Sequence, residues 1–370
     1  MRLLLFTERF RIVGAGAEND AVSLCEELGR RKHEVHVCAD EVDEQEHVQV
    51  HQGLETAAAL ERRLKPDLTI DWGFYRAADV HRVGGGVHRE FLKYALMSAP
   101  PWLRWYKRLE HRFKKKHRSE IRSEEEILRN PRALYLPISN FIAEQLSRAG
   151  IPDERVQVLY NSVDTERFAP DQDVTTRNEL RQQWNVPVDG TVLLFVASDL
   201  RLKNAALLHR VCTRLHQEDA GMRLVVVGKR PPRFHAPWLV WQPTMHDVER
   251  AYAAADILVH PTFYDSFANV VLEAMSCGKP VLVSDRAGVA EIVRAEGGGL
   301  VLDVVSPDAD EHWGREITAL ARDPDLRERF GAKGRRAAGN HPFADYVSQI
   351  EGVLQSCAAA CVSRKLGEMP

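Results

Sequence analysis

The sequence predicts an α/β chain made of two doubly wound domains, each built on a parallel sheet. Three strand–loop–helix units support this prediction, and their apolar first strands lie at residues 2–6, 191–197 and 257–259. Short apolar runs of this kind are typical of strands that are buried on both faces of a parallel sheet. The chain has 370 residues, 44% of them apolar, which is enough for two domains with separate cores.

The first unit opens the amino-terminal domain. A loop with Gly14 and Gly16 follows the strand at 2–6, and a helix and a second strand come next. Because glycine lets a ligand approach the backbone closely, we expect part of a substrate site at this loop. Asp20 follows the loop, where its carboxylate either faces the substrate or stabilises the start of the helix.

A second candidate group lies further along the first domain. A strand at 66–71 is followed by an Ala-Ala-Asp-Val string with Asp79 and by three successive glycines at 84–86. From the residues alone, Asp79 is an aspartate that can cap a loop. Three glycines in a row have a large entropic cost, so we expect this loop to lie close to another group. His81 and His88 could bind substrate, but structural histidines are the favoured interpretation because the chain has 15.

Residues 101–122 combine aromatic and cationic side chains. On a helix, one face would present Trp102, Trp105, Tyr106, Leu109 and Phe113. Nine cations against two glutamates flank this face, and they include Lys107, Arg108, Arg112, Lys114 and Lys115. This composition is typical of a helix at a membrane interface, with rings at headgroup depth and cations on anionic phosphates. The alternative is a solvated helix whose aromatic stripe packs on its own domain. Nucleic acid is not an expected partner, because no base-stacking module accompanies the patch.

The second domain begins with the strand at 191–197, which leads into Arg201 and Lys203. Two cations at the carboxyl end of a parallel strand can bind a diphosphate and stabilise the charge that a departing sugar leaves behind. The alternative is that both are ordinary surface cations.

The stretch from 252 to 294 predicts a strand, a polar loop, a helix and a second strand. We expect Ser266 to cap the helix, which leaves its first amides open to an anion: Phe267, Ala268, Asn269 and Val270. Asp265 and Glu273 flank this position, and a carboxylate beside a diphosphate is repulsive unless it accepts hydrogen bonds from neutral hydroxyls. Sugars supply such hydroxyls, so the combination predicts a nucleotide-sugar. The alternative is that both acids merely favour the start of a helix.

The string from Pro261 to Val281, Pro-Thr-x-x-Asp-x-Phe-x-Asn-Val-Val-Leu-Glu-Ala-Met-x-x-Gly-x-Pro-Val, resembles the donor signature of retaining family 4 glycosyltransferases with the GT-B fold. The first acid is usually Glu in that family and is Asp265 here, and Asn204 replaces a usual glycine after Lys203. In length and motif order the chain resembles lipopolysaccharide-core glucosyltransferases most.

The resemblance implies two facing Rossmann-like domains with a deep cleft between them. It implies an acceptor-binding domain over 1–168, a donor-binding domain over 169–340 and a last helix, 343–357, that packs back on the first domain. The implied reaction moves a hexose from a UDP-sugar to a lipid-linked saccharide such as lipopolysaccharide core, with retention and without a metal or other cofactor.

The resemblance also implies a role for each candidate residue. The diphosphate would bind Arg201, Lys203 and the amides after Ser266. Asp265 would bind sugar hydroxyls and Glu273 the ribose. The Ala-Ala-Asp-Val string is similar to one in the lipopolysaccharide-core enzymes, which implies that Asp79 is the catalytic carboxylate of the first domain and that Asp79 and Asp20 lie beside the acceptor.

Two other functions remain open at this stage, a non-hydrolysing sugar-nucleotide epimerase and an inactive membrane-bound scaffold. The six cysteines have no paired metal-binding spacing, which favours reduced thiols in the cytosol. The first apolar run is too short for a secretion signal, and no run approaches the roughly 20 apolar residues that span a bilayer. We therefore expect a peripheral protein on the inner face of the cell membrane. The nucleobase, sugar and acceptor cannot be identified from the sequence.

Overall fold

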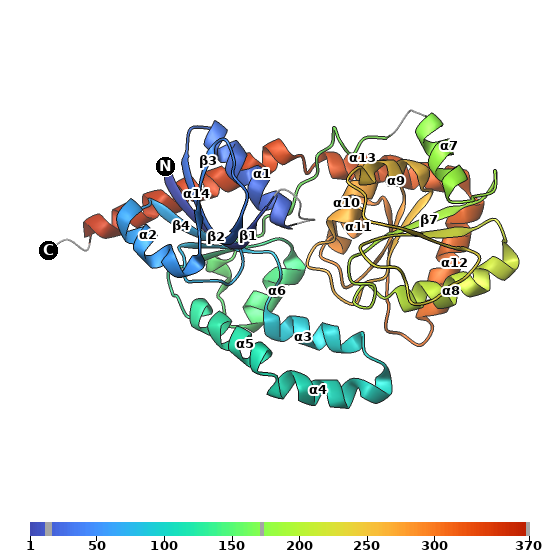
Figure 1. The fold of residues 1–370 in the computed structure, drawn as a ribbon, viewed down its shortest axis with the longest axis horizontal. Helices are drawn as coiled ribbons and strands as arrows, with labels where there is room; N and C mark the ends of the chain where they lie inside the picture. The colour runs from blue at the N-terminus through green and yellow to red at the C-terminus, as the bar shows by residue number, and fades with distance from the viewer. Residues whose placement is uncertain (12–16, 171–173, 368–370) are drawn as a thin grey trace. The chain divides into compact units, whose positions relative to one another are not determined.

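The computed structural model describes the whole chain except residues 12–16, 171–173 and 368–370. The chain divides into two compact units (Figure 1). The first comprises Met1–Leu92, Tyr106–Tyr160 and Ala344–Pro370, and the second comprises Lys93–Trp105 and Asn161–Phe343. The main division thus falls after Tyr160, eight residues before the end of the expected acceptor domain.

The first unit contains a parallel sheet of six strands in the order β3-β2-β1-β4-β5-β6. This is the strand order of a Rossmann fold, in which the chain reverses its direction of progress after β3. The strands are β1 (Arg2–Phe10), β2 (Glu34–Val42), β3 (Val48–Gln52), β4 (Leu68–Asp71), β5 (Val80–Val83) and β6 (Leu134–Pro137).

Helices cover this sheet because its strands are apolar on both faces. Leu4 and Phe6 of β1, for example, are fully buried in a cluster with Leu60 of helix α2. The helices assigned wholly to this unit are α1 (Ala17–Arg30), α2 (Ala57–Leu64), α5 (Lys115–Leu128) and α6 (Asn140–Arg148).

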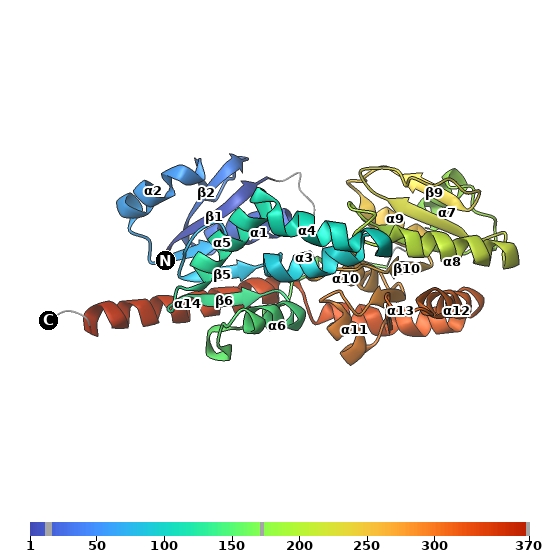
Figure 2. The same ribbon diagram turned by 90° about the horizontal axis from the view of Figure 1, so that it is seen from below.

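The last helix, α14 (Phe343–Gly367), lies alongside the first unit (Figures 1 and 2). Glu351 of this helix accepts hydrogen bonds from Arg31 at 2.9 Å and from His33 at 2.8 Å. These contacts join the end of the chain to the loop between α1 and β2.

The second unit repeats the same topology. Its six parallel strands follow the order β12-β11-β10-β7-β8-β9, which becomes 6-5-4-1-2-3 when they are numbered within the unit. The strands are β7 (Val192–Val196), β8 (Arg223–Val227), β9 (Leu239–Gln242), β10 (Ile257–His260), β11 (Val281–Ser284) and β12 (Gly299–Leu302).

The core of the second unit lies between its sheet and the surrounding helices. Trp313 is fully buried there, and its indole nitrogen donates to the Asp303 carbonyl at 3.0 Å. The helices are α7 (Val174–Gln183), α8 (Ala205–Glu218), α9 (Val248–Ala254), α10 (Asn269–Ser276), α11 (Ala290–Glu296), α12 (Ala309–Arg322) and α13 (Pro324–Gly339).

The aromatic and cationic segment forms a turn and two helices. A short 3-10 turn at Pro101–Leu103 leads into α4 (Arg104–Phe113), and α5 starts at Lys115 after a break at Lys114. Helix α3 (His88–Met97) precedes the turn. Among the helices that the structure describes, none has an apolar stretch long enough to cross a bilayer.

Candidate functional site

The predicted donor residues gather at one edge of the sheet in the second unit. In a doubly wound sheet, ligands bind at the carboxyl ends of strands, at the point where the connections diverge to opposite sides. This point lies between β7 and β10, because β8 follows on one side and β11 on the other. Arg201 and Lys203 follow the end of β7, and Asp265 follows the end of β10. The topology therefore brings together residues that are more than 60 positions apart in the chain.

Lys203 and Asp265 form the centre of this group. Nζ of Lys203 lies 2.5 Å from Oδ2 of Asp265 and donates to the Tyr264 carbonyl at 3.2 Å. Nε2 of His260, the last residue of β10, lies 3.0 Å from the same Asp265 oxygen. The other oxygen of Asp265, Oδ1, accepts from the Phe267 amide at 3.3 Å. Asp265 therefore positions the lysine ammonium in addition to any contact with a sugar.

The charges of this cluster follow from its burial and its contacts. Burial acts to raise the pKa of Asp265, but the Lys203 charge and the His260 hydrogen bond outweigh it and hold that pKa well below its usual range. Burial lowers the pKa of His260, and Asp265 opposes this effect only in part. His260 is neutral near pH 7, and its proton must lie on Nε2, because an ionised carboxylate can only accept.

Arg201 and Asn204 complete the loop after β7. The Arg201 side chain is exposed and has no hydrogen bond or ion pair with the described residues. Asn204, at the N-terminus of α8, has the left-handed backbone conformation, with φ 59° and ψ 43°. Asparagine adopts this conformation more readily than other residues with a side chain. The loop therefore keeps a geometry that glycine would allow, although it lacks the glycine.

The start of helix α10 differs from the sequence prediction. The N-cap residue is Ala268, not Ser266, and no side chain caps the helix. Ala268 has φ 73° and ψ 69°, a left-handed conformation that is strained for a residue with a Cβ. The prediction for Phe267 also needs correction, because its amide donates to Asp265. The amides of Asn269 and Val270 belong to the first turn, which has no acceptor within the helix and favours an anion.

Two further contacts fix the side chains of α10. The Tyr252 hydroxyl donates to Oε2 of Glu273 at 2.7 Å, and burial together with the Glu273 charge holds the pKa of Tyr252 well above its usual value. Asn161 donates to Oδ1 of Asn269 at 2.9 Å. Glu273, the expected ribose ligand, therefore has one of its oxygens held in place by a phenol that stays protonated.

Asp79 lies at the opposite end of its strand from the expected substrate side. It directly precedes β5, and its Oδ2 accepts from the Thr69 amide at 2.9 Å and the Thr69 hydroxyl at 2.7 Å. Thr69 belongs to β4, so these bonds join two neighbouring strands near the amino edge of the sheet. Asp79 thus has a structural role, and its expected catalytic role is not supported by this position because ligands bind at the carboxyl edge.

The other candidates of the first unit lie on or before α1. Asp20 is half-buried in this helix, and its negative charge adds to the effect of burial in raising the pKa of Tyr346 to about 12. Gly14 and Gly16 lie outside the described residues.

The aromatic face of the segment before α5 is exposed to solvent. The exposed fractions are 73% for Trp102, 67% for Trp105 and 68% for Phe113, and Tyr106 and Leu109 are also exposed. The alternative that this stripe packs on its own domain is therefore wrong. Among the cations, Lys107 is paired with Glu110 at 2.5 Å, whereas the flanking basic side chains point to solvent: Arg108, Arg112, Lys114 and Lys115.

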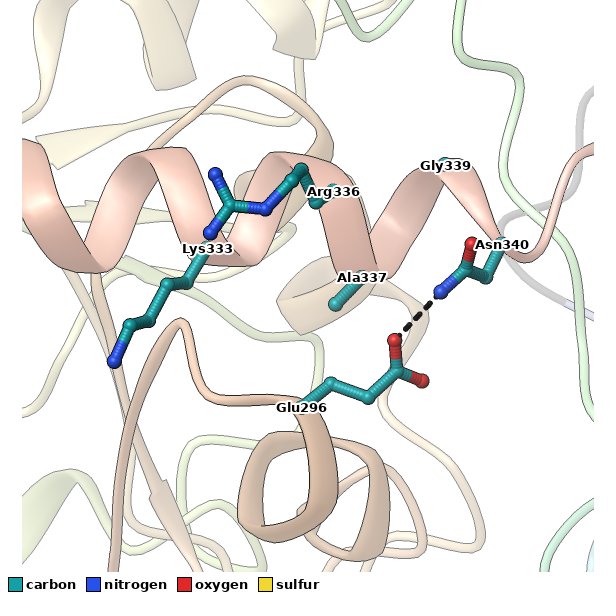
Figure 3. A pocket seen from close by; sticks show the side chains of 6 residues that line it. All are labelled: Glu296, Lys333, Arg336, Ala337, Gly339 and Asn340. Carbon is teal, nitrogen blue, oxygen red and sulfur yellow. Dashed lines mark hydrogen bonds between the residues drawn. The ribbon is translucent and has the colours of Figure 1, made fainter.

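A separate depression of about 570 Å³ lies on α13 of the second unit (Figure 3). Asn340 and Glu296 close one end of it through a hydrogen bond of 2.7 Å. None of its lining residues belongs to the predicted donor group: Glu296, Lys333, Arg336, Ala337, Gly339 and Asn340. This depression therefore does not mark the donor site.

Comparison with known families decides the class of both halves. Residues 176–337 match the family described as Glycosyl transferases group 1, and residues 14–167 match Glycosyltransferase Family 4. Each half of the chain therefore matches a family of glycosyltransferases. The solved structures of similar fold agree, and the chain has the GT-B fold with two Rossmann-like domains.

Individual curated relatives are similar to part of the chain. A D-inositol 3-phosphate glycosyltransferase from Xylanimonas cellulosilytica is 32% identical over 53% of this chain and 50% of its own length. A protein of the same name from Salinispora arenicola is 27% identical over 66% of this chain and 59% of its own length. The chain thus spans only about half the length of the curated relatives that it matches.

Two solved structures match almost the whole chain. WaaG, a glycosyltransferase involved in lipopolysaccharide biosynthesis, has a TM-score of 0.78 at 19% identity and covers 95% of this chain and 99% of its own. HepE from Anabaena, in complex with UDP-glucose, has a TM-score of 0.74 at 17% identity and covers 96% of this chain and 100% of its own. At these identities the likeness concerns the fold.

Sequence reasoning missed three residues of the donor group, namely His260, Tyr252 and Asn161. His260 carried a usable signal, because a histidine that ends a buried strand five residues before an acid can reach that acid. Tyr252 and Asn161 carried none, since they lie 21 and 108 residues from the side chains that they bind.

Proposed function

We propose that this chain is a retaining, metal-independent glycosyltransferase that moves a hexose from a UDP-sugar to a lipid-linked saccharide. The observation that carries the proposal is the Lys203–Asp265 pair at the divergence point of the second sheet, with His260 on the same carboxylate oxygen and Arg201 in the same loop as Lys203. The UDP-glucose complex of HepE, a neighbour of the same fold, supports a UDP-linked donor.

The donor would bind through charges that the site already contains. Arg201 and Lys203 bring two positive charges against the single negative charge of Asp265, and the N-terminus of α10 adds a partial positive charge. The negative diphosphate neutralises the positive charge that remains. Arg201, Lys203 and the start of α10 then stabilise the charge on the leaving nucleotide. Asp265 and Glu273 then accept hydrogen bonds from the hexose and ribose hydroxyls.

The first unit would bind the acceptor, with Asp20 and the loop of Gly14 and Gly16 beside it. The exposed stripe of Trp102, Trp105 and Phe113 supports an acceptor at a membrane surface. In the free protein these rings leave apolar area in contact with water, and insertion into a membrane interface would bury that area. The protein would then act as a peripheral protein on the cytoplasmic face of the membrane.

The donor assignment is tested by binding and turnover. Isothermal titration of the full chain with UDP, GDP and ADP should show the tightest binding for UDP. Release of UDP from UDP-glucose or UDP-galactose should require an acceptor and continue in excess EDTA, and NMR of the product should show the anomeric configuration of the donor. Turnover of the sugar nucleotide without an acceptor would favour the epimerase, and absent binding of any nucleotide would favour the inactive scaffold.

The acceptor class is tested in parallel with two acceptors. Lipopolysaccharide core should accept the sugar if this proposal is right. Inositol 3-phosphate is the second acceptor to include, because the curated relatives are D-inositol 3-phosphate glycosyltransferases. Transfer to inositol 3-phosphate alone would contradict a lipid-linked acceptor and leave the donor assignment intact.

Membrane association is tested with vesicles. Wild-type protein should sediment with vesicles that contain anionic phosphatidylglycerol, and the triple variant W102A/W105A/F113A should not. The single variant W241A is the control, because Trp241 is also exposed but lies on β9, outside the aromatic segment. Equal sedimentation of all three proteins would contradict the assignment.

A further inference from the structure

Three potential metal ligands converge in the first unit, outside the residues that the proposed transfer uses. His88 is the first residue of α3, and His117 and Glu120 lie one turn apart on α5. Nε2 of His88 lies 2.9 Å from Oε2 of Glu120 and 3.1 Å from Nδ1 of His117. Nδ1 of His117 lies 3.5 Å from the same glutamate oxygen. Each side chain is half-buried.

The size of this triangle matches the face of a zinc coordination tetrahedron. Zinc binds histidine nitrogen and carboxylate oxygen at about 2.0–2.2 Å in tetrahedral sites, which places neighbouring ligand atoms about 3.3–3.6 Å apart. The three edges here are 2.9, 3.1 and 3.5 Å, so adjustments of a few tenths of an ångström admit the ion. Two histidines and one glutamate are also a ligand set that zinc uses in proteins, with a fourth position left for water.

Hydrogen bonds within this cluster satisfy its three polar atoms less well than a bound cation would. Nε2 of His88 faces two potential acceptors, and it can direct its one proton at only one of them. A cation placed between the three atoms interacts with all of them at once. The second oxygen of Glu120 lies 3.8 Å from Lys116, so that oxygen is engaged outside the triangle and Oε2 is turned towards the histidines.

The surroundings hold two of the ligands in place. Both oxygens of Glu124, one turn after Glu120, accept from the backbone amide of His88 at 3.0 Å. Glu124 is only 5% exposed, so this contact fixes the start of α3 against α5. The ring of His111 lies edge-on to that of His117, with centroids 5.3 Å apart, and limits how that ring can turn. Metal ligands in proteins are commonly oriented by such outer contacts.

We propose that His88, His117 and Glu120 bind one divalent ion of the zinc class, with water in the fourth position. The ion joins the start of α3, which directly follows the glycine loop after β5, to the helix that follows the aromatic segment. Its role is to cross-link these elements. The proposed donor residues belong to the other unit, and none of them is among the three ligands.

The proposal is tested with the full chain after treatment with a chelator and removal of that chelator. Titration calorimetry with ZnCl₂ should show one site per chain, and zinc should raise the melting temperature. Substitution by Co²⁺ should give the intense visible absorption of a four-coordinate ion. The H117Q and E120Q variants should each bind at least about 100-fold more weakly, because each removes one of three protein ligands.

Two control variants separate a metal site from general histidine binding. H111Q should weaken zinc binding far less than H117Q does, because His111 restrains the ring of His117 but supplies no ligand atom. H312Q should bind zinc like the wild type. His312 lies 3.1 Å from Asp308 in the second unit, so it is a histidine–carboxylate pair outside the proposed site. Circular dichroism of H117Q and E120Q checks that both remain folded. The proposal would be overturned if zinc does not bind at one ion per chain, or if E120Q and H117Q bind zinc as tightly as the wild type.

Discussion

Lys203 and Asp265 form an ion pair of 2.5 Å between the loops that follow β7 and β10. The pair lies where the two halves of the second sheet diverge, and His260 holds the same carboxylate oxygen from behind. The pair explains how one acid can serve a site for an anion. Its negative charge is neutralised by Lys203, and it keeps the lysine at a defined position next to the start of α10.

Replacing Lys203 by Met should therefore impair both catalysis and stability. The loss of one group that stabilises the leaving diphosphate should lower kcat by about 10²–10³-fold. The unpaired Asp265 should lower the free energy of unfolding by about 3 kcal/mol, because a half-buried charge loses its partner. Steady-state kinetics and urea unfolding measure the two effects.

The double variant K203M/D265N tests the origin of the lost stability. It should regain part of the stability that K203M loses, because the buried charge is gone, yet it should stay inactive. The matched control is K333M, which removes an exposed lysine of α13 and should leave both quantities unchanged. Normal turnover of K203M would remove Lys203 from the donor site.

Replacing Asp79 by Ala should cost stability and leave catalysis nearly unchanged. The variant loses the bonds from the Thr69 amide and hydroxyl, which should lower the free energy of unfolding by about 2 kcal/mol. T69V removes the hydroxyl, which both donates to the Asp79 carboxylate and accepts from the Asp79 amide, so it should also lower the free energy of unfolding by about 2 kcal/mol. If D79A instead loses kcat by 100-fold at temperatures where it is fully folded, Asp79 is catalytic as the sequence resemblance implies.

Replacing Ala268 by Gly should stabilise the protein. Ala268 has φ 73°, and a left-handed conformation costs a residue with a Cβ roughly 1–2 kcal/mol that glycine does not incur. Part of this gain is offset by the greater freedom of glycine in the unfolded chain, so we expect an increase of about 0.5–1 kcal/mol. The same change at Ala274, which has a buried helical position, should destabilise by about 1 kcal/mol. Thermal unfolding of the two variants checks the opposite signs.

Lys279 should make the stability of the protein depend on pH. Burial, together with the nearby charge of Arg177, lowers the pKa of Lys279 from 10.5 to about 8, and its ammonium donates to the Ala253 carbonyl at 3.2 Å. Between pH 8 and 10.5 the unfolded chain holds more protons at this residue than the folded one, so this group makes stability rise with pH. Below pH 8 both states are protonated, and the folded state carries the full cost of the buried charge.

K279M should thus raise the free energy of unfolding at pH 7 by about 2 kcal/mol, after allowance for the lost hydrogen bond. The difference between variant and wild type should shrink as the pH rises from 8 to 10.5. Urea unfolding at pH 7, 8, 9 and 10 measures it, with K333M as the exposed control. A constant difference over this range would show that Lys279 titrates normally.

Local sequence patterns were sufficient for much of the fold and for the position of the donor site. The apolar runs at 192–196 and 257–260 predict buried parallel strands, and loops that follow such strands at the carboxyl edge carry Arg201, Lys203 and Asp265. These inferences need only the period of the side chains and the rule that parallel strands end at one edge.

Helix starts were less accurate, because a serine before an apolar run indicates a cap only when the backbone places it there. At Ser266 the chain continues for two more residues, and the left-handed Ala268 begins the helix instead. Asp79 shows that local sequence also does not tell at which end of a strand a residue lies. Its neighbours suggested chemistry, whereas its place before β5 is a matter of strand register.

By itself, the sequence determined two doubly wound units, the loops after two strands of the second unit that carry Arg201, Lys203 and Asp265, and a segment with an aromatic face. All three follow from the spacing of residues that are close in the chain. Only the tertiary structure decided that His260 supports Asp265, that Tyr252 fixes Glu273, and that His88 meets His117 across 29 residues. Such contacts depend on which strands are neighbours and how helices dock on them. The order of the strands and the docking of the helices are set by the packing of the whole chain, so no periodic pattern in the local sequence predicts them.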